Sequence, residues 1–139
     1  MSTSPADFNA KVIEEFRANE GRVGGPFDGM EILLLHHTGA RSGIERINPL
    51  AYRKDGERYV VFASKAGAPE DPAWFHNLVA NPQARIEVGT EELAVLAEEA
   101  RGEERDRLYR EQSEDRPQFR EYEQKTDRVI PVVLLTPAG

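Results

Sequence analysis

Small, hydroxylated and cationic residues gather in two short stretches of this chain, residues 38–50 and 63–67. Each stretch follows apolar residues and contains glycine, which lets the backbone approach a ligand closely. Hydroxyls, backbone N–H groups and a nearby Arg or Lys are the groups that bind a phosphate. The sequence therefore predicts that these two stretches bind an anionic cofactor.

Three cations belong to these stretches: Arg41, Arg46 and Lys65. Arg41 and Arg46 are five residues apart across a glycine-bounded loop. Lys65 follows a strand that is expected to pair antiparallel with the strand after that loop. The three side chains can then converge on a diphosphate or a polycarboxylate. The alternative is that they form surface ion pairs, with Glu31, Glu45 or Asp71.

A helix is expected to begin near Asp71-Pro72, and it carries Trp74, the only tryptophan of the chain. The N-terminus of this helix would add a positive dipole close to Lys65. The indole of Trp74 could stack on a planar ring. A core position explains Trp74 equally well, because large aromatic side chains are usually buried.

Other kinds of site find little support in the sequence. The absence of cysteine excludes disulfides, thiol nucleophiles and cysteine-bound metals. His36 and His37 point to opposite faces of a predicted strand, so hydrogen-bonded structural roles are expected for them. His76 has no histidine four residues further on, and no metal site is predicted. Ser42 and Ser64 lack the sequence of a nucleophile elbow, so any hard chemistry is expected from a cofactor.

The net charge of −7 comes entirely from the second half, because residues 1–65 hold nine acids and nine bases. An acidic half lacks the clustered basic face that nucleic acids require, so no nucleic-acid partner is predicted. Acids of this kind are typical of solvated helix surfaces. The sequence also lacks an apolar run long enough to span a membrane and a signal peptide. We therefore expect a cytoplasmic protein.

The hydrophobic pattern predicts about six strands with helices inserted, which is typical of a small α+β barrel or sandwich. Strands are expected over residues 31–37, 47–53, 59–63, 84–88, 92–97 and 129–135. Helices are expected from an N-cap at Ser4 to Gly21, from Asp71 to Asn81, over 102–113 and over 117–124. Two points stay open: residues 92–97 also favour helix, and Pro131 implies an edge strand or a bulge.

Phe8, Val12 and Phe16 recur every four residues in the first helix and form an apolar stripe. Packing against the core is the simplest role for this stripe. The alternatives are a dimer contact and a weak contact with the inner face of a membrane.

Four blocks of the sequence, in order and at compatible spacing, resemble the deazaflavin-dependent nitroreductase family. They read TGARSG followed by RINPL (38–50), ASKAG (63–67), PAWFHNL followed by ANP (72–82) and TDRVIPV (126–132). The resemblance implies a split β-barrel of the flavin-binding type. It also implies coenzyme F420, an 8-hydroxy-5-deazaflavin with a phosphate and an oligoglutamate tail. The expected organisation is one domain, residues 1–139, with an N-terminal helix and loop over 1–28 and the barrel over 29–139.

The resemblance also implies which residues bind the cofactor. Two arginines would contact the phosphate and the tail, and a proline would shape the ring pocket. The 63–67 stretch would line the phosphate and the ring largely through its backbone, and two residues of the second helix would hold the cofactor. The two arginines are Arg41 and Arg46, and the proline is Pro49. The 63–67 stretch contributes Ser64, Lys65, Ala66 and Gly67, and the second helix contributes Trp74 and Asn77.

The implied reaction is hydride transfer from reduced F420 to an electron-poor acceptor, such as a quinone or a nitro compound. The family's activator of nitroimidazole drugs is tyrosine-rich before the TDR block, whereas residues 116–125 here keep only Phe119 and Tyr122 as aromatics. Tyr122 is therefore the predicted residue on the substrate side, unless it only packs its helix. The alternatives are an FMN-dependent oxidoreductase on the same fold and a non-catalytic deazaflavin-binding protein. The residues themselves do not reveal the oligomeric state; the resemblance implies a homodimer, since barrels of this type commonly dimerise.

Overall fold

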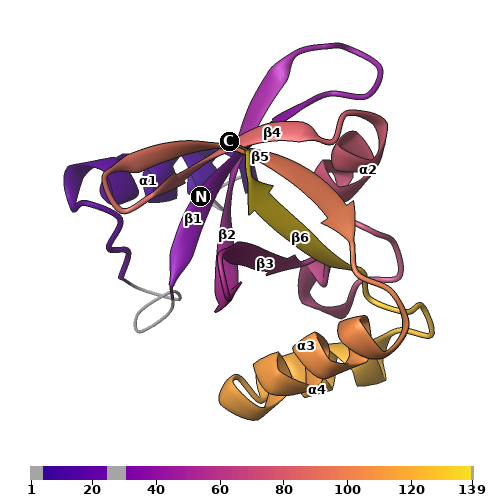
Figure 1. The fold of residues 1–139 in the computed structure, drawn as a ribbon. Helices are drawn as coiled ribbons and strands as arrows, with labels where there is room; N and C mark the ends of the chain where they lie inside the picture. Colours follow the sequence, from indigo (N-terminus) through magenta and orange to yellow (C-terminus); the bar gives the residue numbers. More distant parts are fainter. Residues whose placement is uncertain (1–4, 25–30, 139) are drawn as a thin grey trace.

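Six antiparallel strands form a closed barrel in the computed structural model, which describes residues 5–24 and 31–138 (Figure 1). Around the barrel the strands follow the order β1-β2-β3-β6-β5-β4. Their bounds are β1 (Ile32–Thr38), β2 (Glu45–Asp55), β3 (Arg58–Phe62), β4 (Gln83–Val88), β5 (Glu91–Glu99) and β6 (Val132–Pro137). The predicted α+β fold, a six-stranded barrel with helices packed outside it, is confirmed.

The helices cover different parts of this barrel (Figure 1). Helix α1 packs on the outside of β1 and β2, and α2 covers one end. Helices α3 and α4 lie side by side against the outer face of β3 and β6. The bounds are α1 (Pro5–Ala18), α2 (Ala73–Ala80), α3 (Gly102–Asp115) and α4 (Gln118–Lys125), with a short 3-10 helix, η2 (Lys65–Gly67), after β3. No helix in the described part of the chain is long and apolar enough to cross a membrane.

Alternation along the strands separates an inner from an outer face. Leu33 and Leu35 of β1 lie in the buried cluster inside the barrel, together with Trp74 of α2. Leu34 points the other way and packs against α1. Across β1 and β2, Leu35 lies opposite Asn48, so Asn48 belongs to the inner face as well. This register brings the middle of β2 close to α2.

The first helix packs on the barrel. Val12 and Phe16 are only 5% and 1% exposed, and both lie against Leu34. Packing against the core, the simplest of the three roles expected for this helix, is thereby confirmed. The predicted N-cap Ser4, the side chain of Phe8 and the predicted boundary between residues 28 and 29 lie outside the described residues.

The structure settles the two points that the sequence left open: the strand predicted over residues 92–97 is confirmed, and the interpretation of Pro131 is not. Residues 91–99 form a strand because they pair with β4 on one side and β6 on the other, which overrides their helix propensity. The prediction that Pro131 marks an edge strand or a bulge is wrong, since β6 lies between β3 and β5 and begins only at Val132. Pro131 needs no N–H there, and its carbonyl oxygen accepts a bond of 2.9 Å from the Ala63 N–H.

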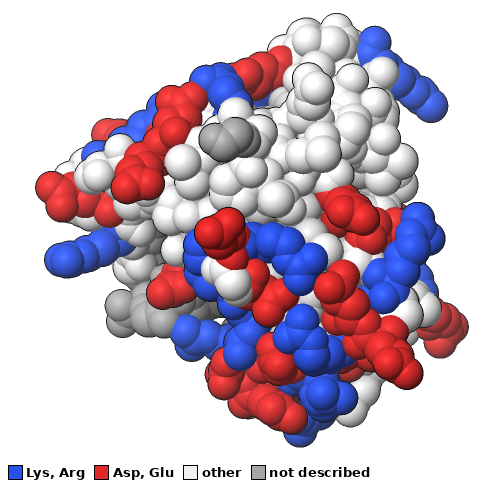
Figure 2. Space-filling model, in the orientation of Figure 1, with Lys and Arg blue, Asp and Glu red and all other residues white. Residues whose placement is uncertain are grey.

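Only part of the acids of the second half lie on the solvated helix surfaces that were predicted for them, because others, such as Glu91 and Glu98, lie on β5. In Figure 2, acidic and basic side chains alternate over the region of α3 and α4. Glu103, Glu104 and Asp106 of α3 are exposed. Ion pairs join α3 to the strands, for example Arg58 with Glu104 at 3.2 Å.

Candidate functional site

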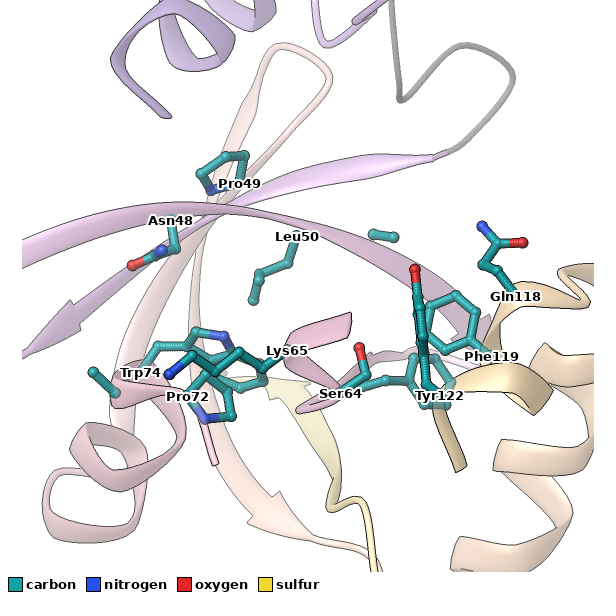
Figure 3. Close-up of a pocket in the computed structure, with 13 residues that line it drawn as sticks. Asn48, Pro49, Leu50, Ser64, Lys65, Pro72, Trp74, Gln118, Phe119 and Tyr122 are labelled. Carbon is teal, nitrogen blue, oxygen red and sulfur yellow. The ribbon is translucent and has the colours of Figure 1, made fainter. Parts of the chain in front are cut away.

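A cleft of about 580 Å³ opens between β2, η2 and the N-terminal turns of α2 and α4 (Figure 3). Clefts that bind small molecules usually measure roughly 300–1,000 Å³ and have apolar walls with a few polar groups. This cleft fits that description. Its lining residues are Asn48, Pro49, Leu50, Ala51, Phe62, Ser64, Lys65, Pro72, Ala73, Trp74, Gln118, Phe119 and Tyr122.

The backbone at η2 has the conformation of an anion-binding nest. Ser64 is right-handed helical, with φ of −76° and ψ of −36°, and Lys65 follows with a φ of +46°. A right-handed residue followed by a left-handed one directs successive N–H groups toward one point, which makes a concavity for anions. A non-glycine residue in this region costs about 1–3 kcal/mol, so other contacts must hold it there.

Arg128, in the loop before β6, supplies such contacts. Its Nε donates to the Ala68 carbonyl at 2.9 Å, its Nη1 to the Ala63 carbonyl at 3.1 Å, and its Nη2 to the Ser64 carbonyl at 2.8 Å. Nη1 also donates to Oδ1 of Asp71 at 2.8 Å, just before α2 begins. One guanidinium therefore binds both the 63–68 stretch and the start of α2.

Lys65 is the one predicted cation that lines the cleft. Its ammonium donates to Glu70 at 2.9 Å, and both side chains are largely exposed. The hydrogen bond from Lys65 holds the pKa of the Glu70 carboxyl below its usual value. Exposed pairs of this kind are weak, so a bound anion can compete for the ammonium.

Arg41 and Arg46 lie beyond the cleft lining, and both are exposed. Arg46 is on the same face of β2 as Asn48 and Leu50, which do line the cleft. Within residues 5–24 and 31–138 neither arginine forms an ion pair. Two of the acids that were their alternative partners bind other arginines: Glu45 pairs with Arg85, and Asp71 with Arg128.

Asn77 lies behind the cleft rather than on it. Its Nδ2 donates to His37 Nδ1 at 3.0 Å, and its Oδ1 accepts the Ala40 N–H at 3.0 Å. His37 Nε2 in turn donates to Asn48 Oδ1 at 2.7 Å, which needs the neutral ring with its proton on Nε2. Burial lowers the pKa of His37 and favours that neutral form. The network ties the loop between β1 and β2 to α2 and to a residue of the cleft.

The structural roles expected for the two adjacent histidines are confirmed. His37 holds the network just described. His36, on the other face of β1, lies between two carboxylates. Its Nδ1 is 3.0 Å from Oε1 of Glu45, and its Nε2 is 2.6 Å from Oε2 of Glu87.

Gly67 packs beneath α4 and is not part of the cleft lining. A Cβ built on it would lie 2.9 Å from Lys125 Cβ and 3.0 Å from the Tyr122 carbonyl oxygen. This close approach brings Tyr122 to the cleft. There its ring lies edge-on to the ring of Phe119, and the two ring centres are 5.2 Å apart. Figure 3 shows the hydroxyls of Tyr122 and Ser64 both directed toward β2. Ala66 contributes its backbone to η2, and its side chain lies outside the described part of the structure.

The structure thus brings five of the ten predicted site residues to one cleft: Pro49, Ser64, Lys65, Trp74 and Tyr122. It adds eight lining residues that were not singled out. Four of them lie within the sequence blocks that resemble the family, so the resemblance could have indicated them as site residues: Asn48, Leu50, Pro72 and Ala73. Phe119 stands out in the sequence as one of the two aromatics of residues 116–125, whereas nothing in the sequence alone marks Ala51, Phe62 or Gln118.

A second hollow, of about 570 Å³, lies between β2 and α3. Charged side chains dominate its lining, among them Arg53 and Asp115, which pair at 2.5 Å. A hollow of this kind suits a planar, largely apolar ring less well than the first cleft does.

A closed barrel with an anion-binding nest beside an apolar cleft defines a small-barrel protein that binds a phosphorylated cofactor. The model of the F420H2-dependent quinone reductase family matches residues 10–137. This chain therefore belongs to that family.

Similar proteins agree with this assignment. The chain is 39% identical over 125 residues to an F420H2-dependent quinone reductase of Mycobacterium tuberculosis, covering 87% of this chain and 84% of that protein. A solved structure of an F420-H2 dependent reductase is 39% identical, with a TM-score of 0.69 over 75% of this chain and 92% of that one. A second solved structure, described as a domain-swapped dimer, is 35% identical. Its TM-score is 0.71, and the match covers 95% of this chain and 99% of that one. The predicted family, the F420-dependent oxidoreductase function and the cofactor F420 are confirmed.

Proposed function

We propose that this protein reduces quinones with F420H2 bound in the cleft between β2, η2, α2 and α4. The observation that carries the placement is the nest at Ser64 and Lys65. It lies on the cleft, and the remaining walls of the cleft are mostly apolar. A phosphate at the nest would direct a planar ring along those walls.

The residues of this chain would divide the binding between them. The N–H groups of the nest and the Lys65 ammonium would bind the phosphate, with Lys65 exchanging Glu70 for the ligand. Trp74 and Leu50, which lies on the cleft side of β2, would bound the ring and keep water from it, and Pro49 would shape the strand at the edge of the cleft. Arg41 and Arg46 would meet the anionic tail outside the cleft. When bound, F420H2 supplies the hydride that reduces the acceptor.

We place the quinone on the α4 side of the cleft. Tyr122 and Gln118 line that side, and the Tyr122 hydroxyl could donate a hydrogen bond to a carbonyl oxygen of the acceptor. The quinone gains a proton together with each hydride, and a donor at this oxygen would stabilise the charge that develops there. We also propose that the protein is a homodimer, which the 35% identical domain-swapped dimer supports.

The test combines a titration with a turnover assay. F420 fluorescence is titrated with the protein, and FMN is titrated in parallel. Oxidation of F420H2 is then followed with menadione and with a nitroaromatic acceptor. We expect F420 to bind more tightly than FMN and menadione to be reduced in a protein-dependent reaction. Tight binding of F420 without oxidation by any acceptor would instead support a carrier protein, and preference for FMN would refute the cofactor.

Charge in the cleft is tested with Lys65→Ala. We expect weaker F420 binding and a weaker salt dependence, because a charge-assisted contact to an anion is lost. Lys54→Ala is the matched control, since Lys54 is also an exposed lysine and lies on the second hollow. An equal loss in both variants would contradict the phosphate role of Lys65.

A further inference from the structure

We propose that Arg128 is a positioning residue that shapes the phosphate-binding nest. Its three bonds to the carbonyls of the 63–68 stretch would orient the N–H groups that bind the cofactor. This inference rests on the proposed function for the identity of the ligand. It adds a residue that does not line the cleft and belongs to a distant part of the sequence.

The geometry of the peptide bond connects these carbonyls to the nest. In a trans peptide the N–H of one residue points opposite to the C=O of the residue before it. The Ala63 and Ser64 carbonyls both point at Arg128. The N–H groups of Ser64 and Lys65 must then point away from Arg128. Ser64 and Lys65 themselves line the cleft, so the guanidinium stands behind the nest whose donors it directs.

The chemistry of the side chain matches this task. A guanidinium presents several N–H donors in a rigid plane, so it can hold carbonyls in different directions at once, which an ammonium cannot do in the same way. The Arg128 side chain is only 14% exposed, and all of its nitrogens donate. Its bond to Asp71 adds the start of α2, the helix that carries Trp74. The nest and the ring-binding tryptophan therefore share one anchor.

The backbone at Lys65 needs such an anchor. A φ of +46° is unfavourable for lysine, and a strained residue persists only where its surroundings over-determine it. Arg128 binds the carbonyl before Lys65 and the Ala68 carbonyl after η2. Without those bonds we expect Lys65 to relax to negative φ, which would disperse the N–H groups of the nest.

Arg105 offers a matched control. Its side chain is 13% exposed, and it also bonds a backbone carbonyl with two nitrogens, donating to the Ile130 oxygen at 3.1 and 2.8 Å. It does not line the cleft, and in the described part of the chain none of its hydrogen bonds or ion pairs reaches residues 63–68. Arg105→Lys therefore removes the same kind of buried contact without touching the proposed site.

The experiment compares Arg128→Lys with Arg105→Lys in the full chain. We expect thermal unfolding temperatures to fall in both. The Kd for F420 and the KM for F420H2 should rise at least tenfold only in Arg128→Lys, with the KM for menadione unchanged. Wild-type affinity in Arg128→Lys would overturn the proposal, and so would an equal loss of affinity in Arg105→Lys.

Amide spectra of the cofactor-free proteins separate this inference from the proposed function. The Ser64 and Lys65 N–H resonances should move in Arg128→Lys and stay in place in Arg105→Lys, whether or not the wild type binds F420. Unmoved resonances in Arg128→Lys would overturn the inference. A wild type that fails to bind F420 would overturn the proposed function alone.

A milder variant covers the case in which Arg128→Lys does not fold. Asp71→Asn removes the charge partner and leaves the three carbonyl bonds of Arg128 in place. Because the bond to the start of α2 weakens while the nest keeps its three bonds, we expect the Kd for F420 to rise less than tenfold and the Ser64 and Lys65 N–H resonances to stay in place. A tenfold loss in Asp71→Asn would mean that the pair with Asp71, and not the carbonyl bonds, determines binding.

Discussion

The contact between Gly67 and α4 gives the sharpest mutational prediction. In Gly67→Ala the new Cβ would lie 2.9 Å from Lys125 Cβ and 3.0 Å from the Tyr122 carbonyl oxygen. Neither atom is the free end of a side chain, so η2 and α4 must move apart. Because α4 carries Tyr122, the substitution should change the cleft as well as the stability.

Two costs add in this variant. A φ of +82° is unfavourable for alanine by about 1–2 kcal/mol. Overpacking a close contact adds about 1–3 kcal/mol. Gly56→Ala is the matched control, because Gly56 has a φ of +62° and a Cβ added there would meet nothing within 4 Å beyond its chain neighbours. We therefore expect a loss of about 2–5 kcal/mol for Gly67→Ala and about 1–2 kcal/mol for Gly56→Ala.

Urea unfolding measures the free energy of both variants, and steady-state kinetics measures the cleft. The KM for menadione should rise in Gly67→Ala and stay at the wild-type value in Gly56→Ala. Equal free energies of unfolding in the two variants would refute the close approach. A lower stability with an unchanged KM would refute the link from η2 through α4 to the acceptor side.

Two further predictions concern the ring site and the N-terminal helix. Trp74→Ala should weaken F420 binding at least tenfold in a titration. Because Trp74 is only 5% exposed, the same variant should lower the free energy of unfolding in urea by about 3–5 kcal/mol. Unchanged F420 binding would mean that Trp74 is a core residue only. Bonds from Arg17 and then His36 hold the pKa of the Glu87 carboxyl below its usual value. The folded state thus favours the ionised carboxylate, which stabilises the protein. This stabilisation is fully present above the pKa that Glu87 has in the unfolded chain, and it is lost as the pH falls through the lower pKa of the folded state. Glu87→Gln should therefore cost about 1 kcal/mol near pH 7 and almost nothing near pH 2 in thermal unfolding; a cost independent of pH would contradict this.

Local sequence signals predicted the elements of the fold well. Residues 59–63 are β-branched and aromatic, and Asp55-Gly56 fits a tight turn, so β2 and β3 could be expected as a hairpin. The strand at 91–99 was harder to predict, because Ala, Leu and Glu favour helix and only pairing with β4 and β6 decides the matter. Pro131 led to the wrong prediction of an edge strand or a bulge, because the sequence does not show that the strand begins one residue later, at Val132.

The site was predictable only where its residues are neighbours in the sequence. Ser64 and Lys65 lie two and three residues after the end of β3, and both reach the cleft. The position of the loop after β1 depends on a bond from Ala40 to Asn77, and the nest depends on Arg128, more than sixty residues from Ala63. Contacts between distant segments leave no periodic or local signal. The roles of Asn77 and Arg128 therefore required the structure.

In the proposed function, F420 binds in the cleft with its phosphate at the nest formed by Ser64 and Lys65. Titrating ¹⁵N-labelled protein with F420 while recording amide spectra tests this placement most directly. We expect the largest shifts at the N–H groups of Ser64, Lys65 and Ala66, together with the indole N–H of Trp74. Shifts centred on Arg53 and Asp115, in the second hollow, with the nest unmoved, would contradict it.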